Sequence, residues 1–379
     1  MNDPPKKPDA KSGPARERIG SLLRFAWLLA LFVLFFGILL GGLFELFRFV
    51  DLLLQEWEWG WSVVGRAGLM FVIGVVAIRV SWWLALAILG LVTRKYDLVG
   101  FLDSTILLDR TEYAAFYDRV DEICHQVRAP HPDQIRLNPW PQCYVIEQRS
   151  FSLATQRRLT LVVGLPQMLV FTTCELRVVL THEMAHFGNR DTTLTVFLFR
   201  FVESLRLALA QLRQHWWHRV DPLYWFFAAF YATLHRVAVP VQRRLELHAD
   251  RTSAALCGGE LAAHTLLKNW FLDGQFEEAV EIWTAQSHAA PARANINVFQ
   301  LFADRWRELS PDAEQYLAER LAQEPLLADS DTHPTTHARL ALLREYPAVE
   351  LHDGKPALAL LPNHQALQRQ AAEMLNAES

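Results

Sequence analysis

Two histidines and a glutamate stand close together in residues 179–188, which read VLTHEMAHFG. His182 and His186 are four residues apart, so on a helix they lie on one face and can bind one metal ion together. Glu183 follows the first histidine, where its carboxylate can take a proton from water and return it to a leaving amine. The spacing predicts metal-assisted hydrolysis. A chance match on an amphipathic helix is the competing interpretation.

A third metal ligand is expected further along the chain, because catalytic zinc usually has three protein ligands and keeps one position for water. Glu246 is the strongest candidate, since Asp250 follows four residues later on the same helix face. A carboxylate at Asp250 can hydrogen-bond to a ligating histidine and orient it. Glu203 and His248 are weaker candidates: arginines flank Glu203 three residues away on either side, and His248 points away from the Glu246 face.

Another polar cluster lies in residues 331–340, DTHPTTHARL. If the fold brings His333 and Arg339 to the metal, they can stabilise the oxyanion of a tetrahedral intermediate. His333 and His337 are also four residues apart and could bind a metal of their own, which we consider the weaker interpretation.

Local patterns predict the elements that must position these residues. Thr172 and Glu175 form a capping box, which predicts a helix over residues 172–187 that carries both histidines. Residues 159–163 (LTLVV) predict a strand, because an apolar run is closed by glycine and proline. Residues 111–127 place aromatic and aliphatic side chains on one face of a helix.

Together these motifs resemble the gluzincin membrane metallopeptidases of the HtpX and CAAX-prenyl-protease type (metallopeptidase family forty-eight). Four motifs stand in the family's order: GLP at 164–166, HExxH at 182–186, ExxxD at 246–250 and H-P-x-x-x-x-R at 333–339. The resemblance covers about residues 105–345.

The resemblance implies a zinc endopeptidase of mainly α (α+β) fold, with a helical zincin domain and a small β-sheet. An edge strand of such a sheet can pair with the substrate backbone, and residues 159–163 are our candidate. The implied roles are Zn²⁺ ligands for His182, His186 and Glu246, catalysis for Glu183, support of a ligating histidine for Asp250, and substrate or transition-state contacts for His333 and Arg339.

Two apolar stretches precede the motifs. Residues 25–44 carry no charge and, at about 1.5 Å per residue, can cross a hydrocarbon core of about 30 Å. A cleaved signal peptide is the rival interpretation, but the run is long and no small-x-small cleavage pattern follows. Residues 67–93 are interrupted only by Arg79. We expect a second span there, or a shorter one ending near Arg79 with residues 80–93 along the interface.

Charges around these stretches predict their orientation. Lysines and arginines precede the first stretch and follow the second, while the loop between them is acidic and rich in tryptophan. The positive-inside rule places both ends in the cytoplasm. We expect this domain order: 1–20, a disordered cytoplasmic tail; 21–95, a transmembrane helical hairpin; 96–345, the zinc metallopeptidase domain; 346–379, a C-terminal extension.

One departure from the HtpX pattern lies between the HExxH and the third ligand, where that type has two clear membrane spans. Here residues 192–212 contain Arg200, Glu203 and Arg206, which form one polar stripe suited to packing on a domain or membrane surface. Residues 222–233 are uncharged but short, so we expect a buried or interfacial segment.

Composition limits the remaining functions. Of 379 residues 51% are hydrophobic and 21% charged, and the net charge of −4 comes with no long basic run, so nucleic acid is not an expected partner. Four widely spaced cysteines form no CxxC pair, which fits a reducing compartment.

We therefore expect a membrane-anchored zinc endopeptidase of a bacterial inner (cell) membrane. Its catalytic domain is expected in the cytoplasm, with protein or peptide substrates and the lipid bilayer as partners, in membrane protein quality control or processing. The alternative is a non-catalytic membrane adaptor with a structural zinc site. Structural sites are usually closed by four protein ligands, whereas three ligands beside a glutamate favour catalysis.

Overall fold

The computed structural model describes most residues after 103 and scattered positions before them. The described ranges are 104–149, 157–188, 216–289, 297–309, 334–351 and 354–378, with single positions between 26 and 75 and between 202 and 214. Two compact units divide the chain: Met1–Arg94 with Thr193–Gln242, and Lys95–Thr192 with Arg243–Ser379. The predicted tail over residues 1–20 lies outside the described residues, as do many positions of the two predicted membrane spans.

In the first unit, the described residues of the predicted spans 25–44 and 67–93 are helical. Large apolar side chains among them are exposed, including Trp27, Phe44 and Phe71. Within the described part of the chain, no helix is both long and apolar enough to cross a membrane.

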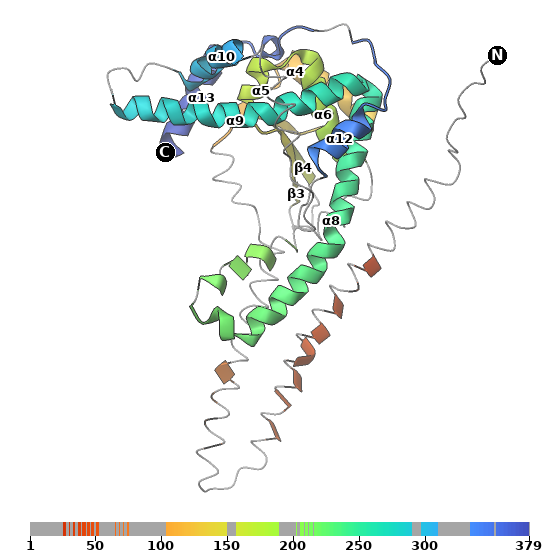
Figure 1. Cartoon of the computed structure of the whole chain (residues 1–379), viewed down its shortest axis with the longest axis vertical. Coiled ribbons are helices and arrows are strands. Elements are labelled where there is room, and N and C mark those ends of the chain that lie inside the picture. Colours follow the sequence, from red (N-terminus) through yellow and green to blue (C-terminus); the bar gives the residue numbers. More distant parts are fainter. Residues whose placement is uncertain are drawn as a thin grey trace, which may run out of the picture. The chain divides into compact units, whose positions relative to one another are not determined.

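Helix α8 (Pro222–Cys257) is one continuous helix of 36 residues with Pro240 in its interior (Figure 1). Its first part contains the uncharged stretch 222–233, and its last part carries Glu246 and Asp250. The uncharged segment 222–233 and the predicted ligand motif 246–250 therefore belong to the same helix.

The second unit contains a four-stranded sheet in the order β1-β2-β4-β3. Its strands are β1 (Ile106–Leu108), β2 (Gln134–Asn138), β3 (Tyr144–Arg149) and β4 (Arg157–Gly164). The β2–β4 pair is parallel, while β1 and β3 pair antiparallel with their neighbours. Leu161 of β4 lies opposite both Ile135 of β2 and Val145 of β3.

The strand predicted over residues 159–163 is confirmed, but its proposed position at the sheet edge is wrong. Strand β4 pairs on both sides, so β1 and β3 are the edge strands of the described sheet. Leu159, Leu161, Val162 and Val163 are all buried. A strand whose successive residues are all buried is covered on both faces, as is typical of a strand in the interior of a sheet.

The second unit also contains a group of helices (Figure 1). They are α4 (Ala114–Val127), α5 (Leu165–Val170), α6 (Thr173–Gly188), α9 (Gly259–Ala289), α10 (Val298–Leu309), α12 (Thr336–Leu343) and α13 (His364–Glu378). The expected apolar face of α4 is confirmed, because Phe116, Tyr117, Val120 and Ile123 are buried. They share one core with residues of β2, β4, α6, α9 and α10.

The predicted capping box at the start of α6 is confirmed. The backbone N–H of Thr172 donates to Glu175 Oε2 over 2.7 Å, and the Glu175 N–H donates to Thr172 Oγ1 over 3.2 Å. Glu175 is buried and also accepts hydrogen bonds from Lys268 of α9. These contacts provide hydrogen-bond partners for backbone N–H groups at the start of α6, and they attach α6 to α9. Both effects fix the helix that carries the HExxH residues.

Part of the C-terminal extension packs into the same core. The backbone N–H of Ala357 donates to the carbonyl of Phe171, immediately before α6, over 2.8 Å. Leu361, Leu367 and Leu375 are buried in the core that contains the sheet and α4. The segment that follows the last predicted motif therefore supports the start of α6.

Candidate metal centre

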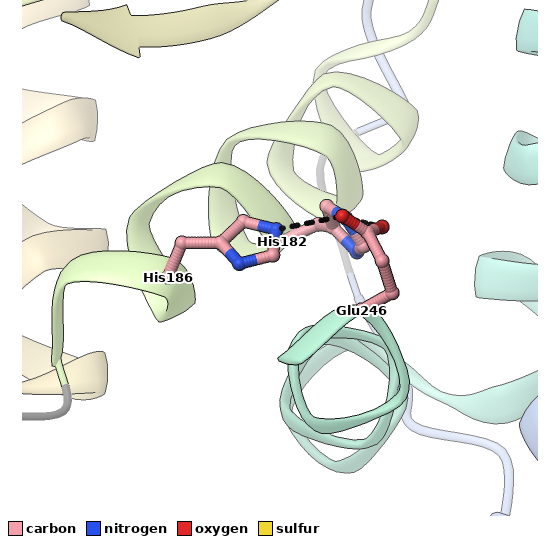
Figure 2. Close-up of side chains that lie close together, drawn as sticks. All are labelled: His182, His186 and Glu246. Carbon is pink, nitrogen blue, oxygen red and sulfur yellow. Dashed lines mark ion pairs between the residues drawn. The ribbon is translucent and has the colours of Figure 1, made fainter. Parts of the chain in front are cut away.

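Three predicted ligands converge in the second unit. His182 and His186 project from one face of α6, and Glu246 reaches them from α8 (Figure 2). Glu246 Oε2 lies 3.5 Å from His182 Nε2, and Glu246 Oε1 lies 3.8 Å from His186 Nε2. One ligand atom from each residue lies within 4.8 Å of the other two.

The spacing of these atoms fits a metal ion. Tetrahedral zinc with bonds of about 2.0–2.1 Å to nitrogen and oxygen separates its ligand atoms by about 3.3 Å. The two distances of 3.5 and 3.8 Å require only small side-chain adjustments to reach that value. Two imidazoles and one carboxylate, with no fourth ligand in the group found among the described residues, correspond to a catalytic site with an open position.

Asp250 contacts the ring nitrogen of His182 that lies away from Glu246. His182 Nδ1 lies 3.1 Å from Asp250 Oδ1, and only 3% of the Asp250 side chain is exposed. Because Nδ1 faces a carboxylate, it would keep its proton when a metal binds, and Nε2 would then offer its lone pair to the metal. One turn of α8 separates Asp250 from Glu246, so the same helix supplies a ligand and the group that orients another ligand.

Arg339 of α12 completes this arrangement. Its Nε donates to Asp250 Oδ2 and a terminal nitrogen donates to Asp250 Oδ1, both over 2.7 Å. This two-point pair is largely buried, since 17% of the Arg339 side chain is exposed. The pair fixes the plane of the Asp250 carboxylate and therefore the direction in which it accepts from His182.

The electrostatics distinguish the two histidines. Burial opposes a charge on His182, but hydrogen bonds to Asp250 and Glu246 raise its pKa to about 9. Burial and the neighbouring His182 lower the pKa of His186 to about 4. Burial opposes the charge on Asp250, yet hydrogen bonds from Arg339 and His182 lower its pKa. Without metal, His182 is therefore a cation between two carboxylates, and a bound metal replaces its proton.

Glu183 lines a cavity of about 350 Å³ together with the three ligands. Residues of α9, Thr265, Leu266 and Asn269, form part of the same cavity. These residues were not predicted from the sequence, because they form no recognisable motif among the many polar residues of α9. Cys143 before β3 was also missed; burial and the charge of Glu183 raise the pKa of its thiol.

The structure brings together six of the seven predicted site residues: His182, Glu183, His186, Glu246, Asp250 and Arg339. His333, the seventh, lies outside the described residues, as does the competing ligand Glu203. His248 and His337 do not belong to the described metal group, and His337 is exposed.

A mainly helical domain with a small sheet, in which an HExxH helix meets a glutamate from a second helix, defines a metallopeptidase. The chain belongs to Peptidase family M48, whose family model matches residues 141–347. The match contains every residue of the metal centre and more than half of the chain. No curated protein and no solved structure shows significant similarity to it.

Proposed function

We propose that this protein is a membrane-anchored zinc endopeptidase that hydrolyses peptide bonds of proteins. The observation that carries the proposal is the convergence of His182, His186 and Glu246 beside a cavity that Glu183 also lines. Nitrogen and carboxylate ligands in this number suit zinc, and an adjacent carboxylate suits hydrolysis.

Zinc in this position would supply Lewis acidity, polarising a peptide carbonyl and lowering the pKa of a water molecule. Glu183 accepts the proton of the attacking water and delivers it to the leaving amine. Asp250 keeps His182 in the tautomer whose Nε2 faces the ligand position, and Arg339 balances the charge of Asp250.

The oxyanion of the tetrahedral intermediate needs a hydrogen-bond donor or a positive charge. Both oxygens of Asp250 accept from Arg339, so we assign the main role of Arg339 to holding Asp250. His333 precedes α12 by three residues and remains our proposed contact for the oxyanion.

We propose that β3 (Tyr144–Arg149) binds an extended substrate. Among the described residues, no strand pairs with its outer edge, so its backbone groups can pair with a substrate chain. Strand β3 begins directly after Cys143, whose thiol is close enough to Glu183 for its charge to raise the thiol pKa. A substrate aligned along β3 would therefore pass near the proposed general base.

The membrane anchor is proposed from residues 25–44 and 67–93. Their described positions are helical and leave large apolar side chains exposed, which supports contact with lipid. The flanking charges favour an inner membrane location with the peptidase domain in the cytoplasm, where membrane proteins requiring processing or quality control are accessible.

The test is to compare the wild-type protein with Glu183→Gln. We expect the wild type to hold about one zinc ion per chain and to cleave an unfolded protein such as casein. The variant should keep the zinc and lose at least about a hundredfold in rate, because it lacks a general base. Zinc content is measured by mass spectrometry and cleavage by gel and peptide analysis.

Glu281→Gln is the matched control, because Glu281 is exposed on α9 and should leave cleavage unchanged. Absence of zinc, or cleavage equal in wild type and Glu183→Gln, would sink the proposal. Zinc without any cleavage would instead support the adaptor with a structural site.

A further inference from the structure

The cavity at the metal centre extends along α6 to α9. Val178 and Val179 lie one turn before His182 and Glu183, and with Leu266 they line this cavity of about 350 Å³. At its α9 wall stand two polar residues, Thr265 and Asn269. The lining therefore combines apolar side chains with a few polar groups.

The orientation of the Asn269 amide follows from a chain of hydrogen bonds. The backbone N–H of Gly164 can only donate, so the atom it meets over 3.2 Å must be Oε1 of Gln167. Gln167 therefore directs Nε2 toward Asn269, 2.6 Å away, and the atom it meets must be Oδ1. The remaining polar atom of Asn269 is Nδ2, a hydrogen-bond donor.

The two hydroxyl groups that line the cavity, those of Thr265 and Ser253, act as hydrogen-bond acceptors toward a ligand. Thr265 Oγ1 donates its hydrogen to the carbonyl of Leu261 over 2.7 Å, and Ser253 Oγ donates to the carbonyl of Asp250 over 2.9 Å. Both side chains are buried and line the cavity. Each hydroxyl has one hydrogen, so toward a ligand these oxygens can only accept.

A donor amide and acceptor hydroxyls together match a primary carboxamide, which offers one acceptor and two donor hydrogens. We propose that this cavity selects a carboxamide side chain, glutamine or asparagine, on the substrate residue next to the scissile bond. The inference rests on the proposed peptidase function and names the preference of that same site.

Competing side chains fit less well. Leucine or methionine would leave the Asn269 donor without a partner, which costs binding in a partly desolvated site. Glutamate would bring its negative charge toward Glu183 and Glu246, and lysine would bring donors against Asn269 Nδ2. We expect a preference of about tenfold in kcat/KM for glutamine over leucine, the effect of one unsatisfied polar group.

The experiment uses the full-length protein loaded with zinc and a peptide library analysed by mass spectrometry. Matched peptides then carry glutamine, asparagine, leucine or glutamate at the position next to the mapped scissile bond. Asn269→Leu removes the donor and keeps a side chain of similar size, so kcat/KM for the glutamine and leucine peptides should become about equal. The zinc content of this variant checks that it folds. Gln286→Leu makes the matched change at an exposed position of α9 and should keep the preference.

Equal kcat/KM values for the glutamine and leucine peptides in the wild type would overturn the inference. A glutamine preference that survives in Asn269→Leu would also overturn it. In both cases cleavage that Glu183→Gln abolishes would leave the peptidase proposal standing. If the wild type cleaves no peptide at all, both proposals fall together.

Discussion

The ion pair between Asp250 and Arg339 connects the metal centre to α12, and its removal should weaken metal binding through His182. The perturbation is Asp250→Asn, which keeps the shape of the side chain and removes its charge. Arg339→Met removes the other partner, and the double variant removes both. Together with the wild type, these three variants form a double-mutant cycle that measures the pair separately from its partners.

The burial and distances of these residues set the expected losses of stability and of zinc affinity. Asp250→Asn leaves the guanidinium of Arg339 without an anion while 17% of its side chain is exposed, and breaking a buried ion pair costs about 3–5 kcal/mol. Zinc affinity should fall by about 10–100-fold, because Asp250 orients His182 at 3.1 Å. The double variant removes both charges of the pair, so its stability loss should be less than the sum by about 2–3 kcal/mol.

Two assays read the cycle: zinc affinity from competition with a fluorescent chelator, and stability of the metal-free protein from urea unfolding. Asp304→Asn is the control, since its ion pair with Arg307 is exposed and should contribute about 0–1 kcal/mol. Additive stability losses would refute the coupling. Unchanged zinc affinity in Asp250→Asn would refute the orienting role.

Two further predictions concern protons and the C-terminus. The pKa of His182 is raised from 6.5 to about 9 without metal, so its protonated form dominates below that pH and zinc must displace the proton. Zinc affinity should therefore rise by up to about tenfold per pH unit between pH 6.5 and 9. Titration calorimetry of zinc binding in two buffers measures the protons released, and a value of zero would contradict the prediction. Removing residues after 347 should abolish cooperative unfolding measured by circular dichroism, because the buried side chains of Leu361 and Leu367 are lost. Leu361→Ala alone should lower the free energy of unfolding by about 2–5 kcal/mol. A truncated protein that melts like the full chain would show that the extension is dispensable.

Local sequence determined the parts of the fold whose information lies within a few residues. The helix that carries His182 and His186 was predictable from its capping box, because Thr172 and Glu175 satisfy each other's backbone groups. The strand around Leu161 was predictable from its apolar run. Its place in the sheet interior depends on pairing with β2 and β3, and those partners are not contained in the strand itself.

The metal centre also combines features that the local sequence determined with features that only the tertiary structure decided. The i,i+4 spacing on regular helices determined that His182 and His186 share a face and that Glu246 and Asp250 share another. Only the tertiary structure decided that these faces meet and that Arg339 engages Asp250. It also decided that Asn269 lines the cavity, because contacts between distant helices depend on how the whole core packs.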